Sequence, residues 1–184
     1  MFIRDGTMGA QSARGRKHTV LASPLGELTL VREGAAIVGL YFPHHWYMPV
    51  RAALGPRIDR GFDEIATQLE QYFTGDRVTF DVPMQADGDA FQRSVWDLIS
   101  AVPYGQTITY GALARALGSQ VTAQQAGAAV GRNPLCILVP CHRVVGVGGK
   151  LTGYAGGLSR KRALLELEQA ALLPGTWSVT MPSS

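Results

Sequence analysis

The hydrophobic pattern changes character near the middle of the chain, and this change limits the folds that it can adopt. Before residue 85, β-branched and aromatic residues form short runs that turns interrupt around Pro24 and Gly34. After residue 89, apolar residues recur at helical spacing in several segments. Residues 85–89 are polar and turn-prone, as linkers are. The pattern predicts an α+β protein in which a small N-terminal α/β module, 17–85, precedes a mainly helical C-terminal domain, 86–173.

The N-terminal module is expected to combine a few strands with one helix. Residues 18–42 are typical of two or three short strands, and residues 44–60, with two prolines, of a loop. A helix is predicted over 61–75, because its apolar residues lie 3 or 4 apart and Gly75 follows its end. The sequence VTFDVPM, 78–84, predicts a further strand.

The C-terminal domain begins with three predicted helices, over 91–102, 109–118 and 121–133. Thr109 and Thr122 are the expected N-caps of the second and third helices, and Gly118 is the expected end of the second. Two short helices joined by such a turn indicate a helix-turn-helix. Residues 137–154 predict an apolar strand, a turn and a glycine-rich hairpin, and residues 158–173 an amphipathic closing helix.

The two ends are interpreted as lying outside the fold. Residues 1–16 contain small and polar residues but not the apolar core of a signal peptide, so we interpret them as a leader, and 174–184 as a loose tail. Apolar runs stay well short of the roughly 20 residues that a membrane-spanning helix needs. A cytoplasmic protein without membrane contact is therefore expected.

The distribution of charge hints at a polyanionic partner for the second half. Residues 17–85 carry six Lys and Arg against eight Asp and Glu, whereas residues 86–184 carry eight against five. Metal binding is not expected. A zinc site needs about four ligands with recognisable spacing, and the histidines show no such pairing with the two cysteines, Cys136 and Cys141. No cofactor is implied either.

The segment Pro140-Cys141-His142-Arg143 carries the strongest chemical signal. A thiol is the best side-chain nucleophile once it is ionised, which requires a nearby base or positive field. His142 can supply the base and Arg143 the positive potential, while Glu166 or Glu168 can orient the histidine. Cys136, with apolar neighbours, is interpreted as inert core. In an extended segment the odd separation would place the two thiols on opposite faces, which argues against a disulfide.

A cysteine hydrolase would use the same pair of residues. Adjacent residues of a strand point to opposite faces, so a direct contact between Cys141 and His142 would be difficult and a bridging water would be needed. No oxyanion-hole element is evident in the sequence. A transcription factor is disfavoured as well, because the third helix offers few side chains that could read base edges.

The segment PCHRVVG, with Asn133-Pro134 before it, Thr109-Tyr110-Gly111 upstream and LTGYAGGLSRKRALLELE downstream, closely resembles the O6-alkylguanine-DNA alkyltransferases. This family is also called the methylated-DNA–protein-cysteine methyltransferases. The resemblance covers about residues 18–172. It implies a ribonuclease-H-like N-terminal module, a winged-helix-like C-terminal domain, and a DNA repair protein that takes an alkyl group from guanine O6 once, without turnover.

The resemblance also implies residue roles. Cys141 would be the alkyl acceptor, His142 the general base acting through a water, and Glu168 its orienting carboxylate. Asn133 would hold the active-site turn, and Tyr110 would rotate the lesion's phosphate and help to protonate the departing guanine. The alkyl pocket would be lined by Pro140, Tyr154, Ala155, Gly156 and Gly157.

The implied partner is double-stranded DNA, contacted in the minor groove by a monomer, largely without regard to sequence, with the damaged nucleotide flipped out. The expected contact residues are Tyr110, Gly111, Thr122, Ala123, Gln124, Gly127, Ala128, Gly131 and Arg132. Further basic residues are candidate phosphate contacts: Arg115, Lys150, Arg160, Lys161 and Arg162. Lys161 or Arg162 could instead pair with glutamates of the closing helix.

One position departs from the family pattern. Members usually carry an arginine where this chain has Gln124, a residue expected to fill the space left by the flipped base. Glutamine can occupy that space but brings no cation, so we expect slower capture of the lesion on duplex DNA. Relatives whose nucleophile is replaced act as lesion sensors without catalysis. The presence of Cys141 argues against that alternative.

Overall fold

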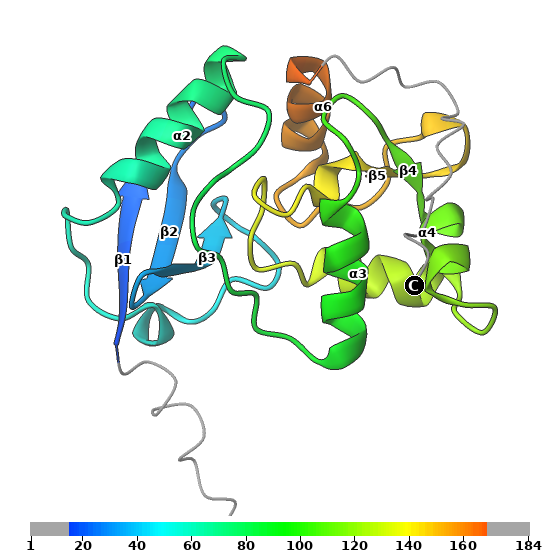
Figure 1. Ribbon diagram of the computed structural model, residues 1–184, viewed down its shortest axis with the longest axis horizontal. Coiled ribbons are helices and arrows are strands. Elements are labelled where there is room, and N and C mark those ends of the chain that lie inside the picture. The colour runs from blue at the N-terminus through cyan, green and yellow to red at the C-terminus, as the bar shows by residue number, and fades with distance from the viewer. Residues whose placement is uncertain (1–14, 169–184) are drawn as a thin grey trace, which may run out of the picture.

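The computed structural model describes residues 15–168, which form a sheet-containing half and a helical half (Figure 1). The first half holds one antiparallel sheet of β1 (Arg16–Leu21), β2 (Leu28–Glu33) and β3 (Ala36–Tyr41), in that order. Helix α2 (Asp63–Thr74) packs on one face through Ile65, Leu69 and Tyr72. The short helix η1 (Arg51–Leu54) places Leu54 in a smaller apolar cluster on the other face.

The predicted helix of this half is present, because its sequence supplies both ends. Asp63 and Glu64 occupy the first turn, where carboxylates interact favourably with the helix dipole. Gly75 ends the helix in the left-handed conformation, with φ of 84°, which glycine adopts without a steric penalty.

The strand predicted over 78–84 is absent. This segment meets the sheet at an isolated bridge between Ile37 and Met84, where the Ile37 N–H donates to the carbonyl of Pro83 over 2.8 Å. Farther back, the side-chain amide of Gln68 pairs with both backbone groups of Asp81, over 2.8 and 3.1 Å. Because these polar groups are satisfied by a side chain, and Pro83 has no N–H to donate, no sheet ladder extends along the segment.

The first three helices of the second half begin at side-chain caps, of which Thr109 and Thr122 are the expected ones. The N-cap residue of α3 (Ala90–Ser100), Asp89, forms a reciprocal capping box with Gln92, and Thr122 does the same with Gln125 at α5 (Ala123–Gly131). Thr109 caps α4 (Tyr110–Leu117), which ends at Gly118. Helices α4 and α5 thus form the predicted helix-turn-helix. The closing helix α6 spans Leu158–Leu167, and the rest of the predicted helix, to 173, lies outside the described residues.

The apolar run Ile137-Leu138-Val139 does not form the predicted strand. It is a buried turn in which Ile137 adopts a left-handed conformation, with φ of 71°. A β-branched residue is strained there by roughly 1–3 kcal/mol, so the surrounding contacts must hold it. The following residues form η2 (Cys141–Arg143) and then β5 (Val144–Val145), which pairs in parallel with β4 (Ile108–Thr109). The glycine-rich segment forms η3 (Val147–Gly149) in place of a regular hairpin.

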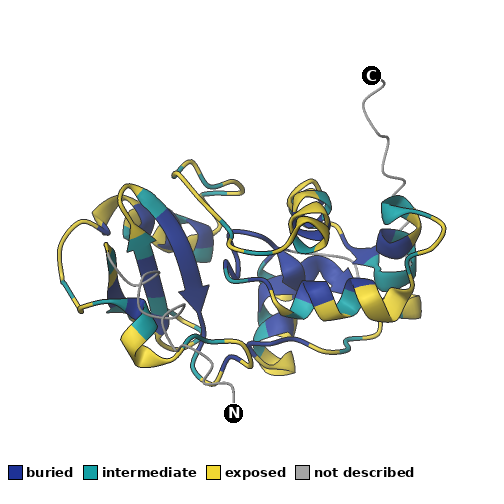
Figure 2. Cartoon of the chain, turned by 90° about the horizontal axis from the view of Figure 1, so that it is seen from below, coloured by how far each residue is buried: buried dark blue, intermediate teal, exposed yellow. Residues whose placement is uncertain are grey.

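The two halves share one continuous core. The edge of β3 accepts residues 134–136 as an added partner: Leu40 N–H donates to the Pro134 carbonyl over 2.8 Å, and Cys136 N–H donates to the Leu40 carbonyl over 3.1 Å. Figure 2 shows buried residues on the sheet and on the inward faces of the helices. The segment that leads into the PCHR motif is therefore anchored on the N-terminal sheet. No helix within residues 15–168 has the length and apolar character needed to cross a membrane.

Candidate active site

Asn133 holds the turn that presents Cys141. Its side-chain amide donates to the carbonyl of Val139 over 2.8 Å, and its side-chain oxygen accepts the N–H of Leu135 over 2.9 Å. Both partners lie in the turn that contains the strained Ile137, and Asn133 itself is buried. The amide thus closes the turn from inside and fixes the start of η2, where Cys141 lies 4% exposed.

His142 and Glu168 form a buried pair behind the cysteine. Nε2 of His142 lies 2.8 Å from Oε1 of Glu168, and both side chains are fully buried. Burial lowers the pKa of His142 and outweighs the opposing effect of Glu168, so the ring is neutral at neutral pH. With Nε2–H donating to the carboxylate, Nδ1 carries the lone pair, and it has no hydrogen-bond partner within residues 15–168.

Glu168 collects donors from three other parts of the chain. Arg143 donates to both carboxylate oxygens, over 2.8 and 2.9 Å, and the hydroxyl of Tyr72 from α2 donates over 2.6 Å. The N–H of Gly105 adds a longer contact of 3.4 Å. Burial raises the pKa of Glu168, but the hydrogen bonds from His142 and Arg143 more than offset it and hold that pKa well below its usual range. The carboxylate is therefore ionised. As a hydrogen-bond acceptor, it fixes the tautomer of His142 that carries its proton on Nε2.

Arg143 does not play the role expected from the sequence. Two of its nitrogens bind Glu168, and Nη1 donates to the carbonyl of Val102 over 2.5 Å. Its charge is neutralised by the carboxylate, because a buried ion pair needs such compensation. Glu166, the other candidate partner of the histidine, is exposed to solvent.

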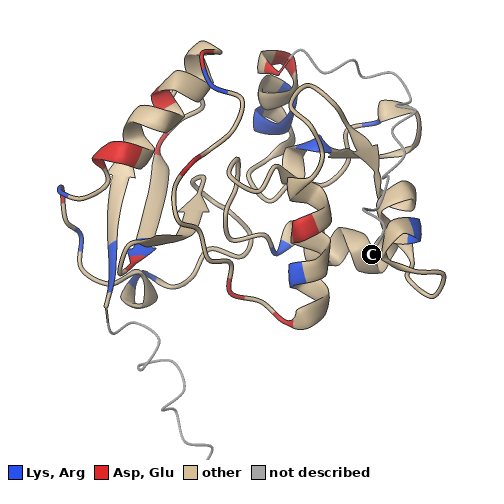
Figure 3. Cartoon of the chain, viewed as in Figure 1, with Lys and Arg blue, Asp and Glu red and all other residues tan. Residues whose placement is uncertain are grey.

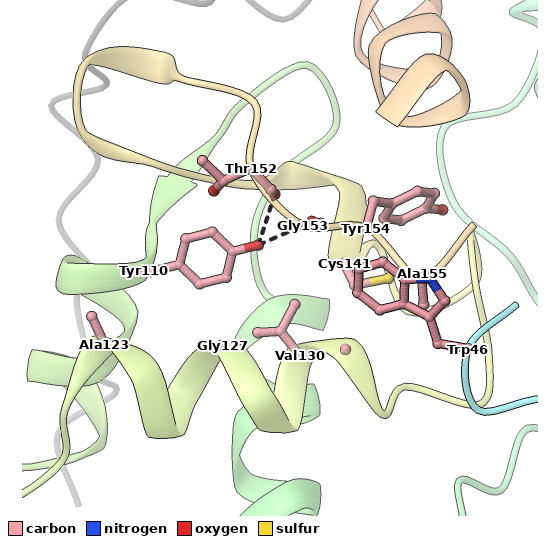
Figure 4. Close-up of a pocket in the computed structure, with 11 residues that line it drawn as sticks. Trp46, Tyr110, Ala123, Gly127, Val130, Cys141, Thr152, Gly153, Tyr154 and Ala155 are labelled. Carbon is pink, nitrogen blue, oxygen red and sulfur yellow. Dashed lines mark hydrogen bonds between the residues drawn. The ribbon is translucent and has the colours of Figure 1, made fainter. Parts of the chain in front are cut away.

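Cys141 opens onto a cavity of about 300 Å³. The cavity lies between α5, the start of α4 and the loop before α6 (Figure 4). Its walls are mostly apolar and small, with three aromatic rings: they comprise Trp46, Tyr110, Ala123, Gly127, Val130, Gly131, Cys141, Thr152, Gly153, Tyr154 and Ala155. Such a site suits a flat, largely apolar group that brings its reacting atom to the sulfur.

The two cysteines are not on opposite faces, contrary to the sequence prediction. The turn replaces the extended backbone on which that prediction relied, and both thiols are buried and free. A hydrogen bond from Cys136 lowers the pKa of Cys141 and more than offsets burial; Asn133 and Lys161 lower it further. The hydrogen bond to Cys141 also raises the pKa of Cys136. Of the two thiols, Cys141 is therefore the one whose ionised form is favoured.

Lys161 is buried inside the protein, so it is neither a phosphate contact nor a partner of the glutamates on its helix. Its Nζ donates to the carbonyls of Thr152 and Gly153, over 2.9 and 3.2 Å, and to the hydroxyl of Tyr110 over 3.5 Å. Burial lowers its pKa to about 8. The ammonium ties the pocket loop to α6 and to Tyr110.

Tyr110 is the first residue of α4, and its hydroxyl lies beside the pocket loop that contains Thr152 and Gly153. The hydroxyl is 3.3 Å from the carbonyls of Thr152 and Gly153 and can donate to either. Burial raises the pKa of Tyr110 to about 12, so the group stays protonated at neutral pH and can act as a hydrogen-bond donor.

The other residues expected in the pocket divide into two groups. Tyr154 and Ala155 line it, and Pro140 is the buried N-cap of η2 beside Cys141. Gly156 and Gly157 do not line it. A β-carbon at Gly156 would approach the ring of Phe42 to 2.7 Å, so this glycine allows the loop to pack against the N-terminal half.

Sequence reasoning missed four residues that line the pocket, Trp46, Val130, Thr152 and Gly153, and Trp46 is the one that comes from the N-terminal half. It lies in the segment between β3 and η1, which the sequence predicted to be a loop. No local pattern links residue 46 to Cys141, because the two meet only through packing of the two halves.

The expected DNA-contacting residues of α5 form one accessible face. Ala123, Gly127 and Gly131 line the pocket, and the remaining side chains are exposed: Thr122, Gln124, Ala128 and Arg132. Gly111 is half-buried at the start of α4. Of the other basic candidates, Arg115, Lys150 and Arg162 are exposed, whereas Arg160 binds the carbonyls of Leu25 and Gly156. Figure 3 shows basic residues on α4 and α6 and acidic ones along α2.

Both halves of the chain match models of one protein family. Residues 17–86 match the ribonuclease-like domain of 6-O-methylguanine DNA methyltransferase, and residues 90–170 match its DNA binding domain. The expected ribonuclease-like module is therefore confirmed.

Curated relatives and solved structures agree with these matches. A methylated-DNA–protein-cysteine methyltransferase of Mycobacterium tuberculosis is 44% identical over 154 residues, which cover 83% of this chain and 92% of the relative. One from Methanosarcina acetivorans is 50% identical over 107 residues, 58% of this chain and 69% of the relative.

The crystal structure of the Mycobacterium tuberculosis O6-methylguanine methyltransferase superposes with a TM-score of 0.77 at 42% identity, over 84% of this chain and 93% of that one. A structure of the Mycobacterium tuberculosis protein in complex with DNA gives a TM-score of 0.78 at 39% identity, over 86% and 95%. With its fold and both domains matched, the chain belongs to the 6-O-methylguanine DNA methyltransferase family.

Proposed function

We propose that this protein repairs DNA by transferring the methyl group of O6-methylguanine to Cys141, in a single irreversible reaction. The observation that carries the proposal is the position of Cys141. Its thiol lines an apolar pocket, has a lowered pKa, and lies beside a histidine that a buried carboxylate orients. Family membership supports the reaction class, and this geometry supports the assignment of these residues to the reaction.

The roles of the residues follow from where their free atoms lie. Nδ1 of His142 is the available base, and it takes the Cys141 proton through a water molecule. The thiolate then attacks the methyl carbon: the S–C bond forms as the C–O6 bond breaks, and the electron pair moves to the guanine. The departing base accepts a proton and leaves as neutral guanine. Tyr110, which lines the pocket and is protonated at neutral pH, is the proposed donor.

The product explains why the reaction would occur once. A thioether is neither a base nor a good leaving group, so the methylated sulfur cannot return to its starting state by simple hydrolysis. We therefore expect a stoichiometric reaction, one protein for each lesion.

DNA would approach the accessible face of α5. The small residues Ala123, Gly127 and Ala128 let the helix backbone come close to a groove, and they offer few groups that could read base edges. This composition favours a minor-groove contact that is largely independent of sequence, made by a monomer, with the damaged nucleotide everted into the pocket. The rate of repair should vary little with the bases that flank the lesion.

Intact-mass measurement tests the proposal. After incubation with duplex DNA that contains O6-methylguanine, we expect a single addition of about 14 Da, the mass of a methylene, that maps to the Cys141 peptide. Cys141→Ala should show no addition, and Cys136→Ala, which leaves the acceptor in place, should retain it. Continued turnover by substoichiometric protein, or an addition on Cys136, would contradict the assignment.

A further inference from the structure

Trp46 is a large aromatic side chain that is left uncovered beside the acceptor pocket. Its exposed fraction is 68%, yet it lines the cavity that holds Cys141. Isolated exposed apolar residues are common on protein surfaces and need no explanation. Val50, 75% exposed on the same segment and away from the cavity, is such a residue. Trp46 differs because it faces the place where chemistry is expected.

The residues on either side of Trp46 are anchored, so the backbone that carries the indole is held beside the pocket. The preceding His45 is buried, packs edge-on against Tyr41 and accepts the N–H of Tyr47 on Nδ1 over 3.2 Å. The ring of Tyr47 lies under the guanidinium of Arg132, at 4.8 Å. Arg132 is the C-cap residue of α5, so these contacts fasten the segment to the helix that forms the floor of the pocket.

The depth of the pocket indicates which part of a substrate Trp46 would meet. Cys141 is 4% exposed, so an alkyl group that reaches the sulfur must lie at the deep end. The purine ring would then lie nearer to the mouth. In Figure 4, Tyr110 lies on one side of the pocket and Trp46 on the other, where the indole overlaps Cys141 in that view. An everted base bound there can stack on an aromatic face, a contact that extruded bases commonly make.

We propose that Trp46 is a substrate-binding residue whose indole packs against the everted guanine. The N-terminal half would thereby take a direct part in recognising the lesion, although the nucleophile and its activating residues belong to the other half. This inference rests on the proposed function, because it assumes that an alkylated guanine enters the pocket.

Single-turnover methyl transfer tests the contact. Because base–aromatic stacking contributes about 1–3 kcal/mol per base, Trp46→Ala should lower the second-order rate with O6-methylguanine duplex about tenfold, whereas Trp46→Phe should retain most of it. Val50→Ala, the matched control on the same segment, should react like the natural protein. Thermal unfolding should be unchanged in all three variants, since both side chains are exposed. Unchanged transfer by Trp46→Ala would overturn the proposal.

Two further measurements separate a contact with the base from other roles. With free O6-methylguanine as substrate, Trp46→Ala should again be slower, because the base is present without a DNA backbone. Binding of undamaged duplex should be unaffected. If Trp46→Ala lost only affinity for undamaged duplex, Trp46 would contact the DNA backbone. If Trp46→Ala reacted faster with O6-benzylguanine and equally fast with O6-methylguanine, Trp46 would act by excluding bulky alkyl groups. Either result overturns the proposal.

Fluorescence gives a readout that does not depend on transfer. The chain has three tryptophans, and Trp96 is buried. In a Cys141→Ser background, duplex DNA containing O6-methylguanine should quench tryptophan emission more than the undamaged duplex does, and Trp46→Phe should remove the difference. A difference that persists without Trp46 would contradict the contact. Failure of the natural protein to acquire a methyl group would instead refute the proposed function.

Discussion

The two sides of the turn Cys141–Arg143 have opposite chemical character. Behind it, Glu168 is surrounded by His142, Arg143 and Tyr72, all buried and joined by hydrogen bonds of 2.6–2.9 Å. In front of it, the cavity at Cys141 is lined by small and aromatic residues and opens to solvent. The turn is thus fixed by charge on one side, whereas none of the described residues that line the cavity on the other side is charged.

This difference shows how charged groups can position a reactive thiol without occupying the space that its substrate needs. A buried charge is tolerated only where partners compensate it, so the network behind the turn must be complete and rigid. The substrate side has no such requirement, because an alkylated guanine is neutral and leaves as neutral guanine. Substitutions behind the turn should therefore affect stability and chemistry together. Those in front should affect the reaction and leave stability nearly unchanged.

The largest effect is expected for Glu168→Gln. Arg143 would lose its counter-charge and one of its two acceptor oxygens, and a buried Arg143 without a charged partner should destabilise the protein by about 3–5 kcal/mol. Urea unfolding and single-turnover transfer should both show a large loss. Glu166→Gln, on the exposed face of the same helix, should be nearly neutral. If Glu168→Gln kept the stability of the natural protein, the proposed difference between the charged side of the turn and its substrate side would be wrong.

Tyr110→Phe tests the substrate side. The change removes the hydroxyl but keeps the ring, so stability should change by little, while loss of a donor to the departing base should slow transfer about a hundredfold. Rapid-quench measurement with a saturating lesion duplex isolates the chemical step. Tyr47→Phe, which keeps its ring under Arg132, is the control. An equal rate in Tyr110→Phe would exclude Tyr110 from the proton transfer.

Cys136→Ala should shift the pH dependence of transfer. The hydrogen bond from Cys136 lowers the pKa of Cys141, so the thiolate is available at a lower pH than for an ordinary thiol. Without that donor, the rate should rise with pH along a curve displaced to higher pH, and transfer at neutral pH should be several-fold slower. The maximal rate at high pH should be retained. A displacement of the curve toward lower pH would show that Cys136 raises the pKa of Cys141, contrary to this prediction.

The smallest effect is expected at Gln124, on the exposed face of α5. Gln124→Arg adds a cation where an extrahelical base would leave a gap, and should accelerate capture of the lesion on duplex DNA by several-fold. Transfer from the free base should not change, because no gap forms there. Gln120→Arg, exposed in the preceding loop, adds the same charge elsewhere. Equal acceleration by both variants would indicate general attraction to DNA.

Local signals in the sequence predicted the helices well. The caps at Thr109 and Thr122 and the glycines at the ends of α2 and α4 are encoded in neighbouring residues, so their positions could be read directly. The strand predicted at Ile137 failed for a reason that no local pattern shows. Its left-handed backbone is imposed by Asn133 and by packing on β3, and these tertiary contacts override β propensity.

The candidate site was only partly visible in the sequence. Cys141 and His142 are adjacent and could be recognised from their chemistry, and Glu168 was one of two candidates. The resemblance to a family selected it, and the geometry agrees. The roles of Arg143, Lys161 and Trp46 depend on contacts between distant segments, such as Arg143 with Val102. Residue type and spacing do not contain that information.

The hydroxyl of Tyr72 donates to the carboxylate of Glu168, 96 residues away in the sequence, and this has a consequence for anyone who shortens the protein. A fragment beginning at Ala86 would keep the cysteine, the histidine and the helix-turn-helix. It would lack one donor to Glu168, the sheet edge that supports residues 134–136, and the indole at the pocket mouth. Such a fragment would carry the full reactive motif and still lack the scaffold that aligns it.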